Sequence, residues 1–195
     1  MKIDDVITNI YNEVKRRCEL PSNVYGIGAW DHHIRVVYEL AKKYADDYGA
    51  SFEIVSIAAL LHDIASVTDA KFTEEHHIIG ASIAGELLIK VGYPKDKIDL
   101  VKKCILNHRG SRLMEKTSQE EVCIADCDAM AHFYSVPSLL SMVYREKKLG
   151  IDEGSKFVLD KLERSYNKMS DRGKQLVKKQ YDSAKDILGP LDLKL

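Results

Sequence analysis

The stretch at residues 56–64 contains a histidine and an aspartate, His62 and Asp63, that core packing does not require. Neighbouring residues on a helix point about 100° apart, so one ion between the two directions can take a ring nitrogen and a carboxylate oxygen. The apolar residues before the pair predict a helix that passes through the protein interior. Burying a carboxylate is costly unless a cation or strong hydrogen bonds compensate it. The pair therefore predicts a metal site, although a motif this short also fits a helix cap or a salt bridge.

Further histidines and aspartates lie at predicted helix ends or within a later helix. They are His32, His33, His76, His77, His108, Asp126 and Asp128. A single histidine at a helix end is usually a cap or a surface residue, but several helix ends that converge on His62 and Asp63 would form a pocket. Imidazoles and carboxylates without thiolates suit Mn, Fe, Co, Ni or Zn, and the acidic share also admits Mg.

Composition predicts one globular domain over residues 1–195. The chain is 45% hydrophobic and 30% charged, and it is long enough to bury a core without disulfides. Its formal charge of -1 argues against broad nucleic-acid or anionic-membrane binding. The N-terminus lacks the apolar core of a signal peptide, and no apolar run is long enough to span a membrane, so a cytoplasmic protein is expected. The four cysteines form no C-x-x-C pair and are expected to be free buried thiols.

Apolar residues recur at helical spacing along the chain, and no convincing β alternation is present. The expected helices lie near 3–20, 31–48, 51–63, 75–91, 98–106, 137–149, 152–169 and 171–188, and one more begins at Ser118. Asp31 is the expected N-cap of the second helix, Ser118 and Glu121 form a capping box, and Pro137 suits a first helical turn. Polar loops are expected at 66–75 and 109–117. The fold class predicted is all-α.

The order of a histidine, a His-Asp pair and a distant aspartate resembles the HD-domain superfamily of metal-dependent phosphohydrolases. The segment His32-His33-Ile34-Arg35-Val36 matches the family's H-x-x-R-V form, and the other matching segments are His62-Asp63 and Asp126-Cys127-Asp128-Ala129-Met130. The resemblance spans roughly residues 31–133. It implies an HD-domain-like helical bundle with a core at about 25–135 and flanking C-terminal helices at about 137–190. The matching residues are a specific indication of the fold and of metal binding, but they indicate little about the substrate.

The metal ligands that the resemblance implies are His32, His62, Asp63 and Asp128. His32 is preferred over His33 because it keeps the family's three-residue spacing to Arg35. Asp126 and Asp128 lie about 200° apart on a helix, so only one is expected to face the metal. Asp128 is preferred because a small residue and an apolar residue follow it, as in the family; Asp126 is expected to support the ligands or to replace Asp128.

His76 and His108 decide between one metal ion and two. Relatives with dinuclear sites, such as the HD-GYP phosphodiesterases, carry extra histidines in comparable places. Their GYP signature is missing here, because Gly92-Tyr93-Pro94 precedes His108 and is interpreted as a helix stop. Arg109 would also place a positive charge beside a second cation. The mononuclear case is preferred, in which His76 and His108 bind phosphate. The chain then looks most like the small stand-alone HD hydrolases.

The resemblance implies hydrolysis of a phosphoester or phosphoanhydride bond, in a nucleotide or a similar small phosphorylated molecule. A divalent ion would lower the pKa of a bound water and offset charge at phosphorus. The expected catalytic residues are Asp63, His76 and His108, and the expected phosphate-binding residues are Lys71, Arg109 and Arg112, for which solvated loop charge is an equal alternative. Two other classes stay open: a nucleotide sensor without turnover, and a dinuclear iron oxygenase that uses both His76 and His108 as ligands. Substrate, metal and oligomeric state are not determined by the sequence.

Overall fold

The computed structural model describes residues 2–109 and 115–189, and every regular element within them is a helix. The all-α prediction is therefore confirmed. The chain divides into two compact units, Met1–Asp128 and Ala129–Leu195, whose boundary falls inside helix α7 (Gln119–Tyr134). This division does not test the single-domain prediction, which stays a prediction.

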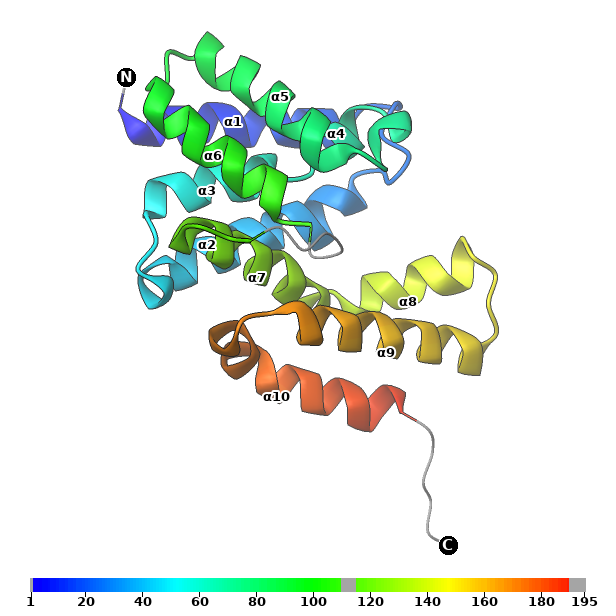
Figure 1. The fold of residues 1–195 in the computed structure, drawn as a ribbon. Helices are drawn as coiled ribbons and strands as arrows, with labels where there is room; N and C mark the ends of the chain where they lie inside the picture. The colour runs from blue at the N-terminus through cyan, green and yellow to red at the C-terminus, as the bar shows by residue number, and fades with distance from the viewer. Residues whose placement is uncertain (1, 110–114, 190–195) are drawn as a thin grey trace, which may run out of the picture. The chain divides into compact units, whose positions relative to one another are not determined.

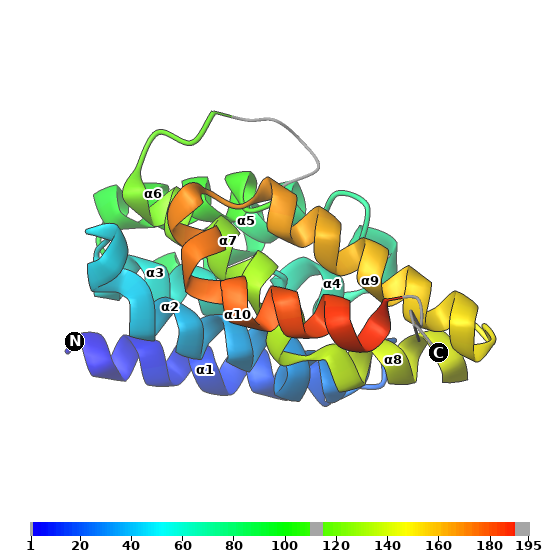
Figure 2. The ribbon, with the colours of Figure 1, turned by 90° about the horizontal axis from the view of Figure 1, so that it is seen from below.

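The first unit contains the helices that precede the boundary (Figures 1 and 2). They are α1 (Ile3–Cys18), the π-helical turn η1 (Trp30–Ile34), α2 (Arg35–Tyr48), α3 (Phe52–Leu61), α4 (Ile64–Thr68), the 3-10 turn η2 (Ala70–Phe72), α5 (His76–Lys90), α6 (Lys95–Asn107) and the first part of α7. Helix α3 packs against α1, α2 and α6, and α5 packs against α4 and α6. Helix α3 is therefore the centre of this unit.

Helix α3 is buried on every side, as the sequence predicted for the segment before His62. All residues from Ile54 to Leu61 are buried. A helix that is apolar all round has no face for solvent and is stable only inside a protein. Its N-terminus is capped by Ser51, whose hydroxyl accepts a hydrogen bond from the Ile54 amide at 3.5 Å. The His62–Asp63 pair thus follows directly on the most buried helix of the unit.

Two local predictions were wrong. Asp31 does not cap a helix, because it lies within the π-helical turn η1, which runs directly into α2 and is anchored by buried Trp30 and Ile34. The segment 66–75 is not a continuous loop, since it contains the end of α4 and all of η2. Burial of apolar Ile64 and Val67 favours the extra helical turn.

One turn prediction is confirmed, and a second is confirmed in part. Gly92 ends the α5 segment with a φ of 69°, a left-handed conformation that favours glycine. Tyr93 is buried and its hydroxyl donates to Glu53 Oε1 at 2.7 Å, so this tripeptide is a structural turn. At α7, the Glu121 amide donates to Ser118 Oγ at 3.3 Å, which is one half of the expected capping box.

The second unit contains the end of α7 and helices α8 (Val136–Arg145), α9 (Ile151–Lys168) and α10 (Asp171–Leu188). Helix α9 packs against both α8 and α10. The rings of Tyr166 and Tyr181 stack with centroids 4.0 Å apart, and Phe133 meets Tyr181 edge-on at 6.1 Å. Pro137 lies in the first turn of α8, as predicted.

The cysteine prediction is confirmed, because Cys18, Cys104, Cys123 and Cys127 are all free and buried. Among the residues that the structure describes, no helix combines the length and the apolar character that crossing a membrane requires.

Candidate metal centre

Two groups of three residues bring metal-ligating atoms together in the first unit. The first group is His33, His62 and Asp128, and the second group is Asp63, His76 and His108. Within each group, one ligand atom from every residue lies within 4.8 Å of the others. The ligands come from η1, the α3–α4 joint, the start of α5, the end of α6 and the middle of α7. Five segments far apart in sequence therefore meet at one place.

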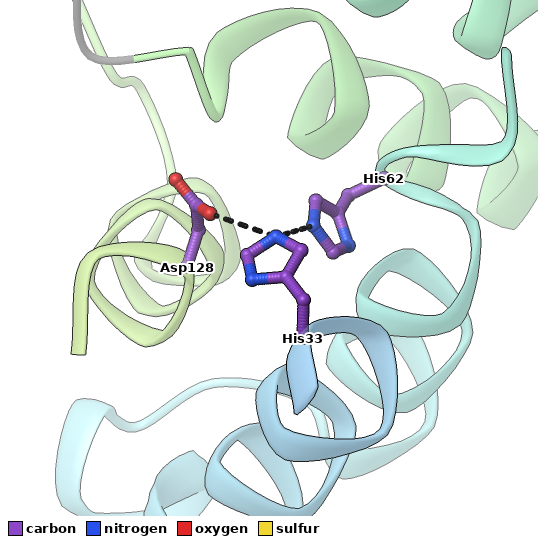
Figure 3. Close-up of side chains that lie close together, drawn as sticks. All are labelled: His33, His62 and Asp128. Atoms are coloured by element: carbon purple, nitrogen blue, oxygen red, sulfur yellow. Dashed lines mark hydrogen bonds and ion pairs between the residues drawn. The ribbon is translucent and has the colours of Figure 1, made fainter. Parts of the chain in front are cut away.

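In the first group the His33 ring lies between the other two side chains (Figure 3). His33 Nε2 is 3.1 Å from His62 Nε2 and 3.4 Å from Asp128 Oδ1. His62 is fully buried and Asp128 is 8% exposed, so the carboxylate has little water to solvate it. A buried carboxylate of this kind needs positive charge beside it.

Asp63 connects the two groups through its two carboxylate oxygens. Oδ2 is 3.3 Å from His33 Nε2 and 3.4 Å from His62 Nε2, whereas Oδ1 is 3.6 Å from His76 Nε2 and 3.9 Å from His108 Nε2. The backbone of Asp63 has φ -108° and ψ 15°, close to the sparsely populated bridge region, where the chain turns from α3 into α4. This turn lets two consecutive residues direct their side chains at the same place.

Three of the histidines are oriented in the same way, through a hydrogen bond to a carbonyl three residues earlier. The bonds are His62 Nδ1 to Ala59 O at 2.7 Å, His76 Nδ1 to Thr73 O at 2.7 Å and His108 Nδ1 to Ile105 O at 2.6 Å. A carbonyl oxygen only accepts hydrogen bonds, so each Nδ1 must carry the hydrogen. In the neutral ring the lone pair is then on Nε2, which faces the other ligands. This is the usual arrangement of a histidine that binds a metal.

The contact between His76 and His108 tests whether these residues fit a metal. Their Nε2 atoms lie 3.2 Å apart, and in neutral rings each would present a lone pair to the other because both Nδ1 atoms donate to carbonyls. Two lone pairs at this distance repel unless a cation lies between or beside them. Nitrogen and carboxylate donors without thiolates suit a divalent ion of the Mn-to-Zn series. The residues therefore fit a divalent metal, whose identity they do not specify.

Burial and charge set opposite pKa values at the two buried histidines. Burial disfavours the charged form of His62, but the adjacent Asp63 carboxylate outweighs it and raises the pKa of His62 to about 9. Burial and the nearby His62 lower the pKa of His108 to about 4. Burial alone would raise the pKa of Asp63, yet the His62 and His33 rings hold it well below its usual value. At neutral pH the metal-free centre thus contains an anionic Asp63, a cationic His62 and a neutral His108.

The structure places His33, rather than His32, in this centre. His32 is exposed and belongs to neither group. The spacing argument from Arg35 assumed an α-helix, but residues 30–34 form a π-helical turn, whose i to i+5 bonds place one more residue in each turn. Arg35 is itself exposed and donates to Asp31 O at 3.3 Å. The geometry therefore reverses the sequence-based choice between the two histidines.

The two aspartates of α7 lie as the sequence argument expected. Asp128 faces the first group, whereas Asp126 is 2% exposed and its Oδ2 accepts a hydrogen bond from the Tyr48 hydroxyl at 2.8 Å. Burial and Asp126 raise the pKa of Tyr48, so its hydroxyl keeps the proton that it donates. Asp126 thus ties α7 to the end of α2 and is not a solvated carboxylate.

The basic residues expected to bind phosphate make local contacts. Lys71 is exposed, and its Nζ lies 2.9 Å from Asp69 Oδ2. Arg109 donates to the Glu74 carbonyl and lies 3.7 Å from the Glu74 carboxylate, so it links the end of α6 to the segment before α5. Arg112 lies outside the described residues. Phosphate binding by all three stays a prediction.

Sequence reasoning missed the groups that hold the ligands in place. The three carbonyls carry no sequence signal, because every residue has one. Gly80, one turn after His76, lies against the His62 carbonyl, and a Cβ built there would be 3.6 Å from that oxygen. The Glu121 carboxylate accepts hydrogen bonds from Thr117 Oγ1 and from the side-chain amide of Asn107, the residue before His108. In a complete capping box this carboxylate would instead accept from the backbone amide of Ser118. Only Glu121 could have been noticed in the sequence.

The model of the HD domain matches residues 30–132, which is more than half of the chain and includes both groups. The chain belongs to the HD-domain family. This family is part of a superfamily of metal-dependent phosphohydrolases, and the His and Asp groups agree with metal binding of unspecified identity. The structure is similar to the crystal structure of Bacillus subtilis YpgQ, with a TM-score of 0.73 and 21% sequence identity over 96% of this chain and 94% of that chain. At this identity the likeness shows the fold alone. A comparison with curated proteins gave no match.

Proposed function

We propose that this HD-domain protein hydrolyses a phosphoester or phosphoanhydride bond in a nucleotide or a similar small phosphorylated molecule, using two divalent ions. The observation that carries the proposal is Asp63, which turns one carboxylate oxygen to the first group and the other to the second. His76 and His108 then act as ligands rather than as phosphate-binding residues. The proposal departs from the mononuclear site that the sequence favoured.

The residues of the centre are suited to hold cations in fixed positions. The low pKa of Asp63 keeps it anionic at neutral pH, so it can serve both groups at once. Each Nδ1–carbonyl bond fixes a ring and leaves Nε2 free to bind. Divalent ions bound there would activate a water and neutralise charge that develops on the phosphoryl oxygens.

Using Asp63, His76 and His108 as metal ligands also affects which groups can transfer protons and bind phosphate. Asp63 is shared by both groups, which leaves it poorly placed to accept a proton from water as a free base. Arg109 directly follows His108 of the second group, and Lys71 lies in η2, on the segment before α5. A substrate phosphate that reached Arg109 would compete with Glu74, an exposed carboxylate that is inexpensive to displace.

A panel of phosphorylated compounds tests this proposal. The metal-free protein is reloaded with Mn, Fe, Co, Ni, Zn or Mg, and release of phosphate and pyrophosphate is measured with nucleoside mono-, di- and triphosphates and with inorganic tripolyphosphate. We expect metal-dependent release from at least one nucleotide and none from Asp63→Ala. Absence of release with every ion would contradict the proposal.

One observation keeps a second candidate function in view. The second group supplies both His76 and His108, the histidines that a dinuclear iron oxygenase on this fold requires. The two functions differ in their need for oxygen. Phosphate release from the iron-loaded protein without oxygen supports the hydrolase, whereas oxygen consumption with no phosphate release supports the oxygenase.

A further inference from the structure

The connection between α1 and η1 exposes three large apolar side chains to solvent. The exposed fractions are 66% for Val24, 50% for Tyr25 and 42% for Ile27. Single exposed apolar residues are common, but three within four positions concentrate apolar surface in one loop. We refer to residues 24–27 as the apolar loop.

The backbone of this loop is fixed by a buried side chain. Asn23 is 5% exposed, and its amide nitrogen donates to the Cys18 and Gly26 carbonyls, each at 2.9 Å. Its amide oxygen accepts from the Tyr25 amide at 3.1 Å. Gly26 has a φ of 60°, which a glycine adopts without strain. The loop thus presents its apolar side chains from a defined backbone, which lowers the entropic cost of binding a ligand.

The loop lies between segments that carry ligands of both groups. The Tyr25 hydroxyl is 3.2 Å from Thr73 Oγ1, and the carbonyl of the same Thr73 accepts the bond from His76 of the second group. At its other end the loop leads directly into η1, which carries His33 of the first group. In Figure 1 the connection after α1 can be followed to the segment between α4 and α5. The exposed tyrosine ring is therefore next to the shell of the metal centre.

We infer that the apolar loop binds the planar nucleobase of the substrate while the two groups hold its phosphates. This inference rests on the proposed function and deepens it. A base offers an apolar π-face, and an exposed tyrosine is a large stacking surface that loses little conformational entropy. The Tyr25–Thr73 bond fixes the ring at a constant position relative to His76. Val24 and Ile27 add exposed apolar surface on either side of the tyrosine, which a base can cover.

The test uses pairs of probes that differ in the base. Adenosine monophosphate is paired with ribose 5-phosphate, and adenosine triphosphate with inorganic tripolyphosphate, all with the metal-loaded full chain. The variants are Tyr25→Ala, which removes the ring, and Tyr25→Phe, which keeps it. The control is Ile89→Ala, which removes another exposed apolar side chain, 69% exposed, about 20 Å along α5 from His76.

We expect Tyr25→Ala to raise the KM of base-containing probes roughly tenfold, in the range that loss of one stacking partner gives, with kcat nearly unchanged. Tyr25→Phe keeps the ring but loses the bond to Thr73, so its KM should rise by less than that of Tyr25→Ala. Ile89→Ala should keep the wild-type KM, and the probes without a base should be unaffected by every variant. An equal change for both members of a pair, or no change for either, would overturn the inference. A second result would also overturn it: wild type self-associates, Tyr25→Ala does not, and the KM values of the two proteins are equal. A second copy of the chain would then be the molecule that binds the loop.

A binding measurement separates failure of this inference from failure of the proposed function. If no probe is hydrolysed, calorimetry of adenosine triphosphate and tripolyphosphate is performed with wild type and Tyr25→Ala. Loss of affinity in the variant for adenosine triphosphate alone would keep the base-binding role while the hydrolase proposal fails. Equal affinities in both proteins would reject the base-binding role as well.

Discussion

The two groups of the metal centre share one aspartate but differ in charge. The first group has a carboxylate of its own, Asp128, and a histidine whose pKa is raised to about 9. The second group, within the described residues, has only the shared Asp63, and the pKa of its His108 is lowered to about 4. An ion at the first group therefore meets more negative charge, so we expect it to bind more tightly. The second ion should be the one that is lost first.

Removal of Asp63 should have the largest effect, because among the described residues it alone directs one carboxylate oxygen to each group. We expect Asp63→Ala to lose both ions and to reduce hydrolysis below detection. The matched control is Asp69→Ala, which removes a half-buried carboxylate at the N-terminus of η2, six residues later. Metal content and turnover are measured for both. Retention of both ions in Asp63→Ala would show that the groups do not depend on a shared ligand.

The histidines of η1 test the first group alone. His33→Ala should weaken the tighter ion by more than the roughly 10–100-fold typical of a residue outside the ligand shell, and should leave the second group able to bind. His32→Ala should change neither, because His32 is exposed and outside both groups. Competition with a metal chelator measures each affinity. Weaker metal binding in His32→Ala than in His33→Ala would identify His32 as the ligand, as the spacing to Arg35 had favoured.

This pair of histidines also shows where sequence reasoning ended. Helical periodicity predicted the elements well, and α10 was predicted with both ends correct at 171–188. At His32 and His33 the geometry differs from the sequence-based choice, because that choice depended on the number of residues in one turn. A π-helical turn is not visible in a periodicity of apolar residues, since Trp30 and Ile34 also fit an α-helix.

The second group shows a different limit. The sequence singled out His76 and His108 as functional, but could not show that their Nε2 atoms meet 3.2 Å apart with Asp63 beside them. That contact depends on the packing of α5 against α6 and on backbone carbonyls at the two histidines. Residue types can thus be read from a sequence, whereas the number of ions they hold depends on tertiary distances.

The pKa values predict that the two ions respond differently to pH. His62 is protonated below about pH 9 in the metal-free protein, so an ion at the first group must displace its proton. Its affinity should rise roughly tenfold per pH unit between pH 7 and 9, and one proton should be released at pH 7. His108 is already neutral above about pH 4 and requires no such release. Calorimetry in buffers of different ionisation enthalpy counts the protons, and equal release at both steps would contradict the assignment.

The contact between Tyr48 and Asp126 should have the smallest effect of these changes. Asp126→Asn should weaken the ion of the first group by roughly tenfold, since Asp126 positions α7 without entering either group. Tyr48→Phe removes only the donating hydroxyl and should have a similar or smaller effect. Affinity of the second group should be unchanged in both variants. A loss of the first ion as complete as that in Asp128→Asn would make Asp126 a ligand.

The number of ions per chain tests the central proposal most directly. Metal content is measured by mass spectrometry after reloading and desalting of wild type, His33→Ala and His108→Ala. We expect about two ions in wild type and about one in each variant, with the ion that remains in His108→Ala being the tighter one. A single ion in wild type that is retained in His108→Ala would contradict the dinuclear centre and return His108 to a role in phosphate binding.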